Sequence, residues 1–300
     1  MPPSRLRAFV ASVALTLLAL ACDASLDSDD SHSSRGRAED EWARGYPAAG
    51  GARLELVNVN GSISAEAAEG ASLELVAKRE ASARSDEAAQ ELLAKLEMRE
   101  SARDGVVRVE VVHPELPRSA NIEVRWTVRV PAGVSVDLHN ENGRISLAGL
   151  SGEVRAHTVN GAVSGKALAS TLVEAKTVNG QVELELAKPL TGTGSVALAA
   201  VNGGVELRLP GDSKASLSAS VTNGSVRAEG FELAKSGASS RTRLEGTLGG
   251  GGTPVTLETT NGSARITNAT APSEPENAEP TPSALPAADP ERIADGAVSV

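Results

Sequence analysis

Apolar and polar residues alternate along most of the chain, and the alternation repeats around Asn-Gly pairs. At positions −6, −4 and +3 from each asparagine the residue is apolar, as in Val173, Ala175 and Val182, whereas position −5 is mostly polar. A period of two on both sides of a turn predicts strands with one buried face. The pairs are Asn60-Gly61, Asn142-Gly143, Asn160-Gly161, Asn179-Gly180, Asn202-Gly203, Asn223-Gly224 and Asn261-Gly262.

The spacing of these pairs predicts how the strands are arranged. From Asn142 to Asn223 the intervals are 18 to 23 residues, and the last interval, to Asn261, is 38 residues. Self-similarity at a period of about 20 residues is typical of a stacked array. The long interval is expected to hold a degenerate rung at residues 243–248, followed by the glycine run at 249–252.

Two architectures fit this pattern. Asn-Gly is a strong hairpin signal because both residues tolerate positive φ, so a sandwich of hairpins is one alternative. A solenoid explains the constant register better, because stacked corners would place the asparagines about 4.8 Å apart, where their amides can form a ladder. We therefore predict a mostly β fold, a single-stranded β-solenoid or β-helix-like array, in which the Asn-Gly pairs are structural turns.

The period breaks after the first pair. Ser85 and Asp86 offer an N-cap, and Ala89, Leu92, Leu93 and Leu96 follow at helical spacing. The sequence therefore predicts one amphipathic helix at about residues 86–98, inserted into a solenoid domain at residues 52–268.

The N-terminus has the features of a targeting segment. Arg5 and Arg7 precede an apolar stretch, residues 8–20, that is short for a bilayer span. Residues 1–21 are therefore predicted to be a signal peptide. The sequence LALAC resembles a bacterial lipoprotein signal, which implies cleavage before Cys22 and a diacylglyceryl group on its sulfur; ordinary cleavage that leaves a free thiol is the alternative. Because Cys22 is the single cysteine, no intrachain disulfide can form.

Two segments lack periodicity. Residues 22–51 are mostly small, polar and charged, and they are expected to form a disordered tether, although Trp42 and Tyr46 could dock on the first rung. Residues 269–300 are rich in proline, glutamate and alanine, and they are expected to form a disordered tail. The net charge of −10 argues against nucleic acid as a partner.

Candidate chemistry is sparse. His139 and His157 occupy position −3 of consecutive units and could join Asp137 or Glu141 in a metal or pH-sensing site. Two imidazoles without a third fixed ligand make a poor metal site, so two solvated histidines are the favoured interpretation. The outward columns contain no repeated pair of acids, and Trp126 is the single tryptophan of the β-region. The sequence thus predicts neither an enzyme nor a cofactor.

Some phrases of the chain resemble a known family. The run RVPAGVSVDLHNENGRI, the recurring V-N-G-x-V units and the closing LGGGGTPVTLETTNGSARI look like the bacterial putative-adhesin family of unknown function. The resemblance covers about residues 53–267 and implies a β-solenoid fold and an envelope location. It implies no catalytic residues.

These observations lead to a functional hypothesis. We predict a non-catalytic cell-envelope lipoprotein, on the periplasmic or the outer surface, that acts as an adhesin or a protein-interaction scaffold. Its expected partners are the membrane, through the lipid, and an unknown protein or surface polysaccharide. The alternatives are an envelope-stress or regulatory accessory protein that binds a membrane partner, and a β-helix that binds or cleaves polysaccharide.

Overall fold

The computed structural model describes residues 35–48, 50–235 and 239–269, which form one body of β-strands with a single helix among them. The predicted signal peptide, Cys22 and the tail from residue 270 onward lie outside the described residues.

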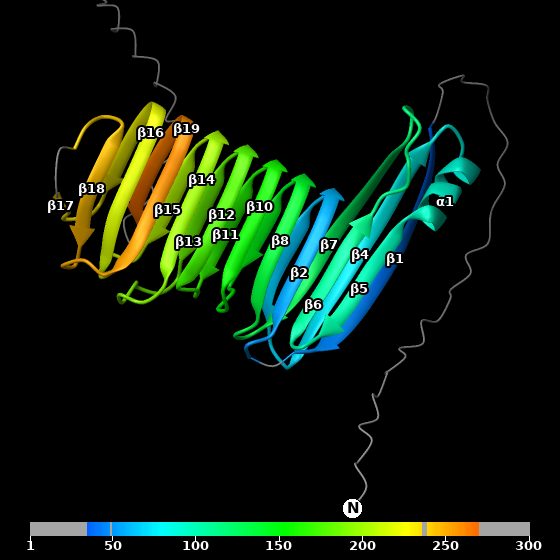
Figure 1. Cartoon of the computed structure of the whole chain (residues 1–300), viewed down its shortest axis with the longest axis horizontal. Helices are drawn as coiled ribbons and strands as arrows, with labels where there is room; N and C mark the ends of the chain where they lie inside the picture. Colours follow the sequence, from blue (N-terminus) through cyan, green and yellow to red (C-terminus); the bar gives the residue numbers. More distant parts are fainter. Residues whose placement is uncertain (1–34, 49, 236–238, 270–300) are drawn as a thin grey trace, which may run out of the picture. The chain divides into compact units, whose positions relative to one another are not determined.

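Each regular rung consists of a strand, an Asn-Gly corner and a second strand. The strands before the corner form the first wall of the solenoid, and those after it form the second wall (Figure 1). The first wall contains β2 (Arg53–Asn60), β8 (Ser135–Asn142), β10 (Val154–Asn160), β12 (Leu172–Asn179) and β14 (Ser195–Asn202). The second contains β3 (Ile63–Ala68), β9 (Ile145–Ala148), β11 (Val163–Leu168), β13 (Val182–Leu186) and β15 (Val205–Leu209). Two long strands, β16 (Ala215–Glu229) and β19 (Thr253–Asn268), run through the corner and belong to both walls.

Equivalent strands pair in parallel and in register. His157 of β10 is paired with Lys176 of β12, and Val163 of β11 is paired with Val182 of β13. A sandwich of hairpins would instead pair each strand in antiparallel fashion across its own turn. The predicted β-solenoid is therefore confirmed.

The order of the rungs departs from the order of the chain at the C-terminal end. Strand β19 lies between β14 and β16, so that Asn261 is paired with Asn202 on one side and with Asn223 on the other. The expected degenerate rung is wrong, because β18 (Arg243–Leu248) runs antiparallel to β16 and, with β17 (Ala234–Lys235), covers the end of the first wall. The chain turns back after β16, and β19 then pairs with the edge of β14 and β15.

Antiparallel pairs close the other end of the solenoid. Strand β7 (Asn121–Pro131) extends the second wall beside β3, and β4 (Ser72–Ala83) and β1 (Gly36–Pro47) are added to it antiparallel. On the first wall, β6 (Val106–Val112) lies beside β2 and is covered by β5 (Glu97–Arg103). Neither edge of the regular parallel rungs is left bare at this end.

Strand β1 corrects the predicted tether. Residues 36–47 lie within the segment expected to be disordered, yet they pair with β4 along their whole length. Trp42 packs edge-on against buried Trp126, with ring centroids 5.6 Å apart, and Tyr46 donates a 2.6 Å hydrogen bond from Oη to Glu100. These contacts with distant parts of the chain order a sequence whose own pattern is polar.

The inserted helix α1 (Asp86–Lys95) lies beside β1 and β4 (Figure 1). Ser85 caps it, because its hydroxyl accepts from the backbone N–H of Ala88 at 3.3 Å. The helix buries Ala89, Leu92 and Leu93, as the sequence predicted. It ends at Lys95 instead of Met98, because the chain enters β5 at Glu97.

The interior has an apolar and a polar part. The predicted columns are buried, as at Val173, Ala175 and Val182. Position −2 also points inward, and there the residues are often polar, as in Thr158 and Thr177, which are only 4% exposed. Each hydroxyl donates to the carbonyl oxygen of the corner glycine on the preceding rung, at distances of 2.8 to 3.0 Å. These buried hydroxyls thus link their rungs to the neighbouring corners.

The corner glycines are required by close packing of the backbone. A Cβ at Gly180 would overlap the carbonyl oxygen of Gly161, and one at Gly203 would overlap that of Gly180. The expectation that the asparagines supply positive φ is wrong, since Asp104 and Ala167 are the non-glycine residues with positive φ in the described chain. The stacking of one corner on another excludes a side chain here.

Candidate functional site

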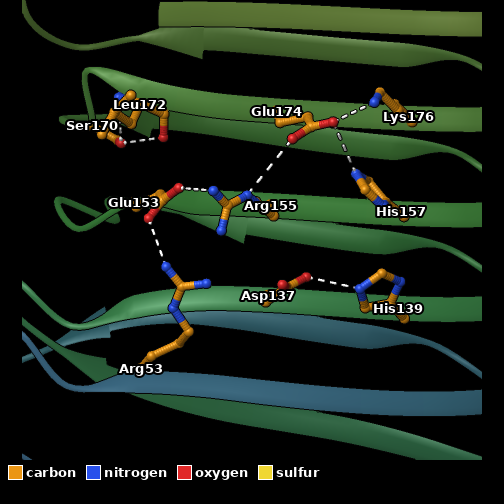
Figure 2. Close-up of polar contacts among 10 residues, drawn as sticks. All are labelled: Arg53, Asp137, His139, Glu153, Arg155, His157, Ser170, Leu172, Glu174 and Lys176. Carbon is orange, nitrogen blue, oxygen red and sulfur yellow. Dashed lines mark hydrogen bonds and ion pairs between the residues drawn. The ribbon is translucent and has the colours of Figure 1, made fainter. Parts of the chain in front are cut away.

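The outward side of the first wall carries a ladder of charged side chains between rungs (Figure 2). Glu153, in the turn before β10, accepts a 2.9 Å hydrogen bond from Arg53 and also contacts Arg155. Arg155 Nε lies 3.7 Å from Glu174 Oε2 on the next rung, and Lys176 pairs with the same carboxylate. Each charge of the ladder therefore has an opposite charge on its own rung or on a neighbouring one.

Figure 2 also shows how the chain enters β12. The Ser170 hydroxyl donates to the backbone oxygen of Leu172 at 2.9 Å and accepts from its N–H at 3.3 Å. This local pair of bonds fixes the turn that positions Glu174 and Lys176 on the following strand.

The two histidines singled out from the sequence lie side by side on adjacent rungs. The rings of His139 and His157 meet edge to face, with centroids 5.1 Å apart. His139 Nε2 lies 2.9 Å from Asp137, and His157 Nε2 lies 3.6 Å from Glu174. Burial lowers the pKa of His157, and His139 lowers it further. Its neutral form is therefore favoured in the fold.

Two further results concern this wall. The hydrogen bond from Lys176 lowers the pKa of Glu174, which keeps that carboxylate ionised. Within residues 35–48, 50–235 and 239–269, no group of three or more His, Cys, Asp or Glu side chains is placed to hold a metal ion.

A groove of about 590 Å³ runs across the strands of the first wall beside the histidines. Its apolar floor consists of the residues directly before three corners, Val159, Val178 and Val201, which are 42%, 39% and 42% exposed. Thr260 and Thr222 continue this line on β19 and β16. A groove with a row of exposed apolar side chains on its floor is the candidate binding surface of the described chain.

The charges along this groove differ between its two ends. Position −3 holds His139, His157 and Lys176 on β8, β10 and β12, then Ala199 on β14 and Glu258 on β19. Lys176 is paired with Glu174, whereas no basic side chain of the described chain lies within ion-pair distance of Glu258. The groove thus has one uncompensated acid at its β19 end.

The alternation of apolar and polar residues puts position −1 on the outside, but it does not identify the groove. The signal was visible in the valine that precedes Asn-Gly in three units. Its meaning depends on which rungs become neighbours, because only the pairing of β10, β12 and β14 brings the three valines into one row.

The asparagines lie at the corners beside the groove. Their amides form a continuous ladder, with Nδ2 to Oδ1 distances of 2.8 to 2.9 Å from each rung to the next. Each asparagine uses its side chain on the neighbouring rungs, which supports the structural interpretation of the pairs. The ladder follows spatial order, so Asn261 donates to Asn202 and Asn223 donates to Asn261.

A protein-family model matches the part of the chain that contains the regular rungs from β8 onward. Residues 129–267 match the family model described as Toastrack DUF4097. This segment is a Toastrack domain. It contains the groove, both histidines and the two phrases on which the family resemblance was based. The match begins at the end of β7, so β1 to β6 precede the Toastrack segment.

Several solved structures are similar to this chain. A putative cell adhesion protein from Clostridium sporogenes is 14% identical, with a TM-score of 0.49, and the match covers 77% of this chain and all of that one. A putative adhesin from Bacteroides fragilis is 12% identical over 76% of this chain and 97% of its own, with a TM-score of 0.34. A putative lipid binding protein from Parabacteroides distasonis is 9% identical over 76% and 96%, with a TM-score of 0.30. At this level of similarity they carry no argument about what the Toastrack domain binds.

A search of curated proteins found no match to the sequence. Among the described residues, no helix is both long and apolar enough to cross a bilayer.

Proposed function

We propose that the protein is a non-catalytic binding protein of the cell envelope, which recognises an adhesion target or a protein partner through the groove of the first wall. The observation that carries this proposal is the row of exposed valines at Val159, Val178 and Val201. The parallel ladders beneath them hold the row rigidly, so little order has to be gained on binding.

The charges around the groove support binding better than catalysis. Arg155, Glu174 and Lys176 form one connected set of ion pairs, which fixes their side chains against each other. A general base or a nucleophile needs a group whose reactive atom is free to face the substrate. The ladder instead provides a fixed polar margin beside an apolar floor.

We further propose that a lipid on Cys22 anchors the protein. Because β1 begins at Gly36, 13 residues separate it from Cys22. A fully extended chain of that length spans about 45 Å. The tether then keeps Gly36 within that distance of the membrane, which is compatible with the second candidate, the accessory protein that binds a membrane partner.

The anchor and the groove require separate tests. Cys22→Ser is expected to remove the protein from the membrane fraction and to abolish labelling by a palmitate analogue. Equal labelling of this variant would contradict the lipid anchor.

The groove is tested by binding of purified protein to washed cells that lack its gene. Val178→Glu places a charge on the apolar floor and is expected to lower the retained protein at least several-fold. Glu183→Lys, an exposed charge reversal on the outer side of the second wall, is the matched control. Equal retention of both variants would exclude the groove as the binding surface. Binding that appears only after the inner membrane is exposed would favour the membrane partner.

A further inference from the structure

We infer that Asn223 is a site of spontaneous covalent modification, at which the side-chain amide is lost and an aspartate or isoaspartate is formed. Asn-Gly is prone to this reaction, because the glycine nitrogen can approach the asparagine side chain without hindrance from a Cβ. The chain contains seven Asn-Gly pairs, so the dipeptide alone does not distinguish Asn223 from the others. The distinction comes from the fold, which covers the other corners and leaves the one at Asn223 and Gly224 open.

The corner glycines of the other rungs have their nitrogens held in place. Five of them donate the backbone N–H to the carbonyl oxygen of the asparagine in the next corner, at 2.8 to 3.0 Å: Gly61 to Asn142, Gly143 to Asn160, Gly161 to Asn179, Gly180 to Asn202 and Gly203 to Asn261. A sixth, Gly262, is covered by the corner of β16, with which it is paired in register. A nitrogen held in this way cannot turn toward its own asparagine side chain.

The series of corners stops at β16. In the part of the chain that the structure describes, no rung follows at this corner, because β18 pairs with the first part of β16 only. The N–H groups of Val221 and Val226, on the two sides of the corner, donate to the carbonyl oxygens of Thr242 and Arg241. Both flanks are thus fixed, while the N–H of Gly224 between them has no next corner to which it could donate.

Solvent exposure distinguishes the same corner. Gly224 is exposed, whereas the other six corner glycines are half-buried. A Cβ at Gly224 would overlap the carbonyl oxygen of Gly262, but no corner of the described chain is packed against Gly224 from the other side. The Nδ2 of Asn223 donates to Asn261 Oδ1 at 2.8 Å, and no further asparagine follows to donate to its own Oδ1. Water therefore reaches the pair, and the ladder holds Asn223 from one side only.

The reaction needs only water and hydroxide. The nitrogen of Gly224 gives its proton to hydroxide and attacks Cγ of Asn223, so that a C–N bond forms and the Cγ–Nδ2 bond breaks. The amide nitrogen leaves as ammonia with a proton taken from water. The cyclic imide then adds one water at either of its carbonyl carbons and opens to aspartate or isoaspartate.

The product changes the end of the asparagine ladder. It removes the donor of the last amide bond and places a carboxylate beside Asn261 Oδ1, so that one acceptor faces another. The corner of β16 then loses its side-chain link to β19. Thr222 and Thr260, which line the groove, directly precede these two asparagines.

The test incubates the full mature chain with Cys22→Ser in mildly alkaline buffer and digests it in mild acid, where the reaction is slow. Mass spectrometry of the peptides is expected to show conversion at Asn223 at least about tenfold faster than at Asn160 or Asn179, because those corners must first open locally. In urea, which removes the fold, the three asparagines should convert at similar rates. Equal rates in the folded protein would overturn the inference, and so would a preference for Asn223 that persists in urea, because the sequence would then be its cause.

Two variants provide the second readout. Asn223→Gln lengthens the side chain and is expected to abolish the conversion at this position. Asn223→Asp reproduces one product, and hydrogen exchange of the amides in the β16 corner is expected to become several-fold faster, while exchange at the corner of Asn160 stays the same. Unchanged exchange at the β16 corner would overturn the loosening of β16.

Discussion

The hydroxyl of Thr177 donates a hydrogen bond to the carbonyl oxygen of Gly161 on the preceding rung, with Oγ1 and O 2.8 Å apart. Thr177 is buried, and the oxygen that it satisfies belongs to a corner packed against the next corner. Thr158 and Thr259 make the same bond to Gly143 and Gly203. This inner polar row therefore stabilises the corners from within, while the asparagine ladder links them from outside.

Replacing Thr177 by valine keeps the shape of the side chain and removes the donor. The buried carbonyl of Gly161 then loses its partner, which is expected to lower the free energy of unfolding by about 1–3 kcal/mol. Thermal or urea unfolding measures this loss. Thr260→Val, at an exposed position of the same wall, should cost little. Equal losses for the two variants would show that the inner bond contributes nothing.

Two rungs lack the inner donor, because position −2 holds Ala200 on β14 and Val221 on β16. Ala200 of β14 occupies position −2, between Thr177 and Thr259 on the adjacent strands, and it is 5% exposed. Ala200→Thr is expected to supply a hydroxyl to the carbonyl of Gly180 and to raise stability by about 0.5–1.5 kcal/mol. Ala200→Val adds the same bulk without a donor, so it separates the hydrogen bond from packing. A threonine variant no more stable than the valine variant would contradict this expectation.

The position of β19 can be tested by disulfide formation in a chain with Cys22→Ser. Cysteines at 199 and 258 are on paired strands and should link readily, since neighbouring strands are about 4.8 Å apart. Cysteines at 199 and 220 should not, because β19 lies between them and two strand spacings exceed the roughly 7 Å limit between Cα atoms. Stacking in chain order predicts the reverse result.

The stability of the fold should decrease in mild acid. Burial and His139 lower the pKa of His157, and burial also lowers that of His113. In the unfolded chain these histidines take up a proton near pH 6.5, while the folded chain resists it. Their contribution to stability is therefore present above about pH 6.5 and is lost as the pH falls below that value.

This decrease is measured as the fall in Tm between about pH 7.5 and about pH 5.5, a window that lies above the titration of most carboxylates. His157→Gln removes one of the two groups and should make the fall smaller. His139→Gln removes a charge that depresses the pKa of His157, so it should make the fall smaller by a lesser amount. An unchanged fall in His157→Gln would show that His157 does not titrate differently in the two states.

The regular rungs were predictable because the alternation of apolar and polar residues in each one shows which side is buried. Val173, Ala175 and Val182 fall on alternate positions, and the same positions recur in every unit, so one register satisfies them all. Strand β1 was missed because Trp42 and Tyr46 stand in a stretch of small and charged residues and become partly buried through contacts with distant strands. The order of the last rungs could not be predicted because the units are too similar. By sequence pattern, Asn261 fits equally well beside Asn202 or Asn223.

The groove could be predicted only in part. The sequence shows the valines before the corners, but their exposure depends on which strands become neighbours. Glu258 belongs to β19, so its position beside Ala199 follows from the rearranged order. A site to which several rungs contribute can be predicted only when the spatial order of those rungs is known.

The insertion of β19 also determines when the protein can be completed during biosynthesis. Rungs up to β15 can assemble as the nascent chain emerges, because each pairs with strands already made. Strand β16 comes next but cannot take its final place, since β19 must first cover β14 and β15. The edge of this half-built array stays open to other strands until Asn268 has been translated, which exposes the intermediate to aggregation. A chaperone that shields this edge would act at a single defined stage of synthesis.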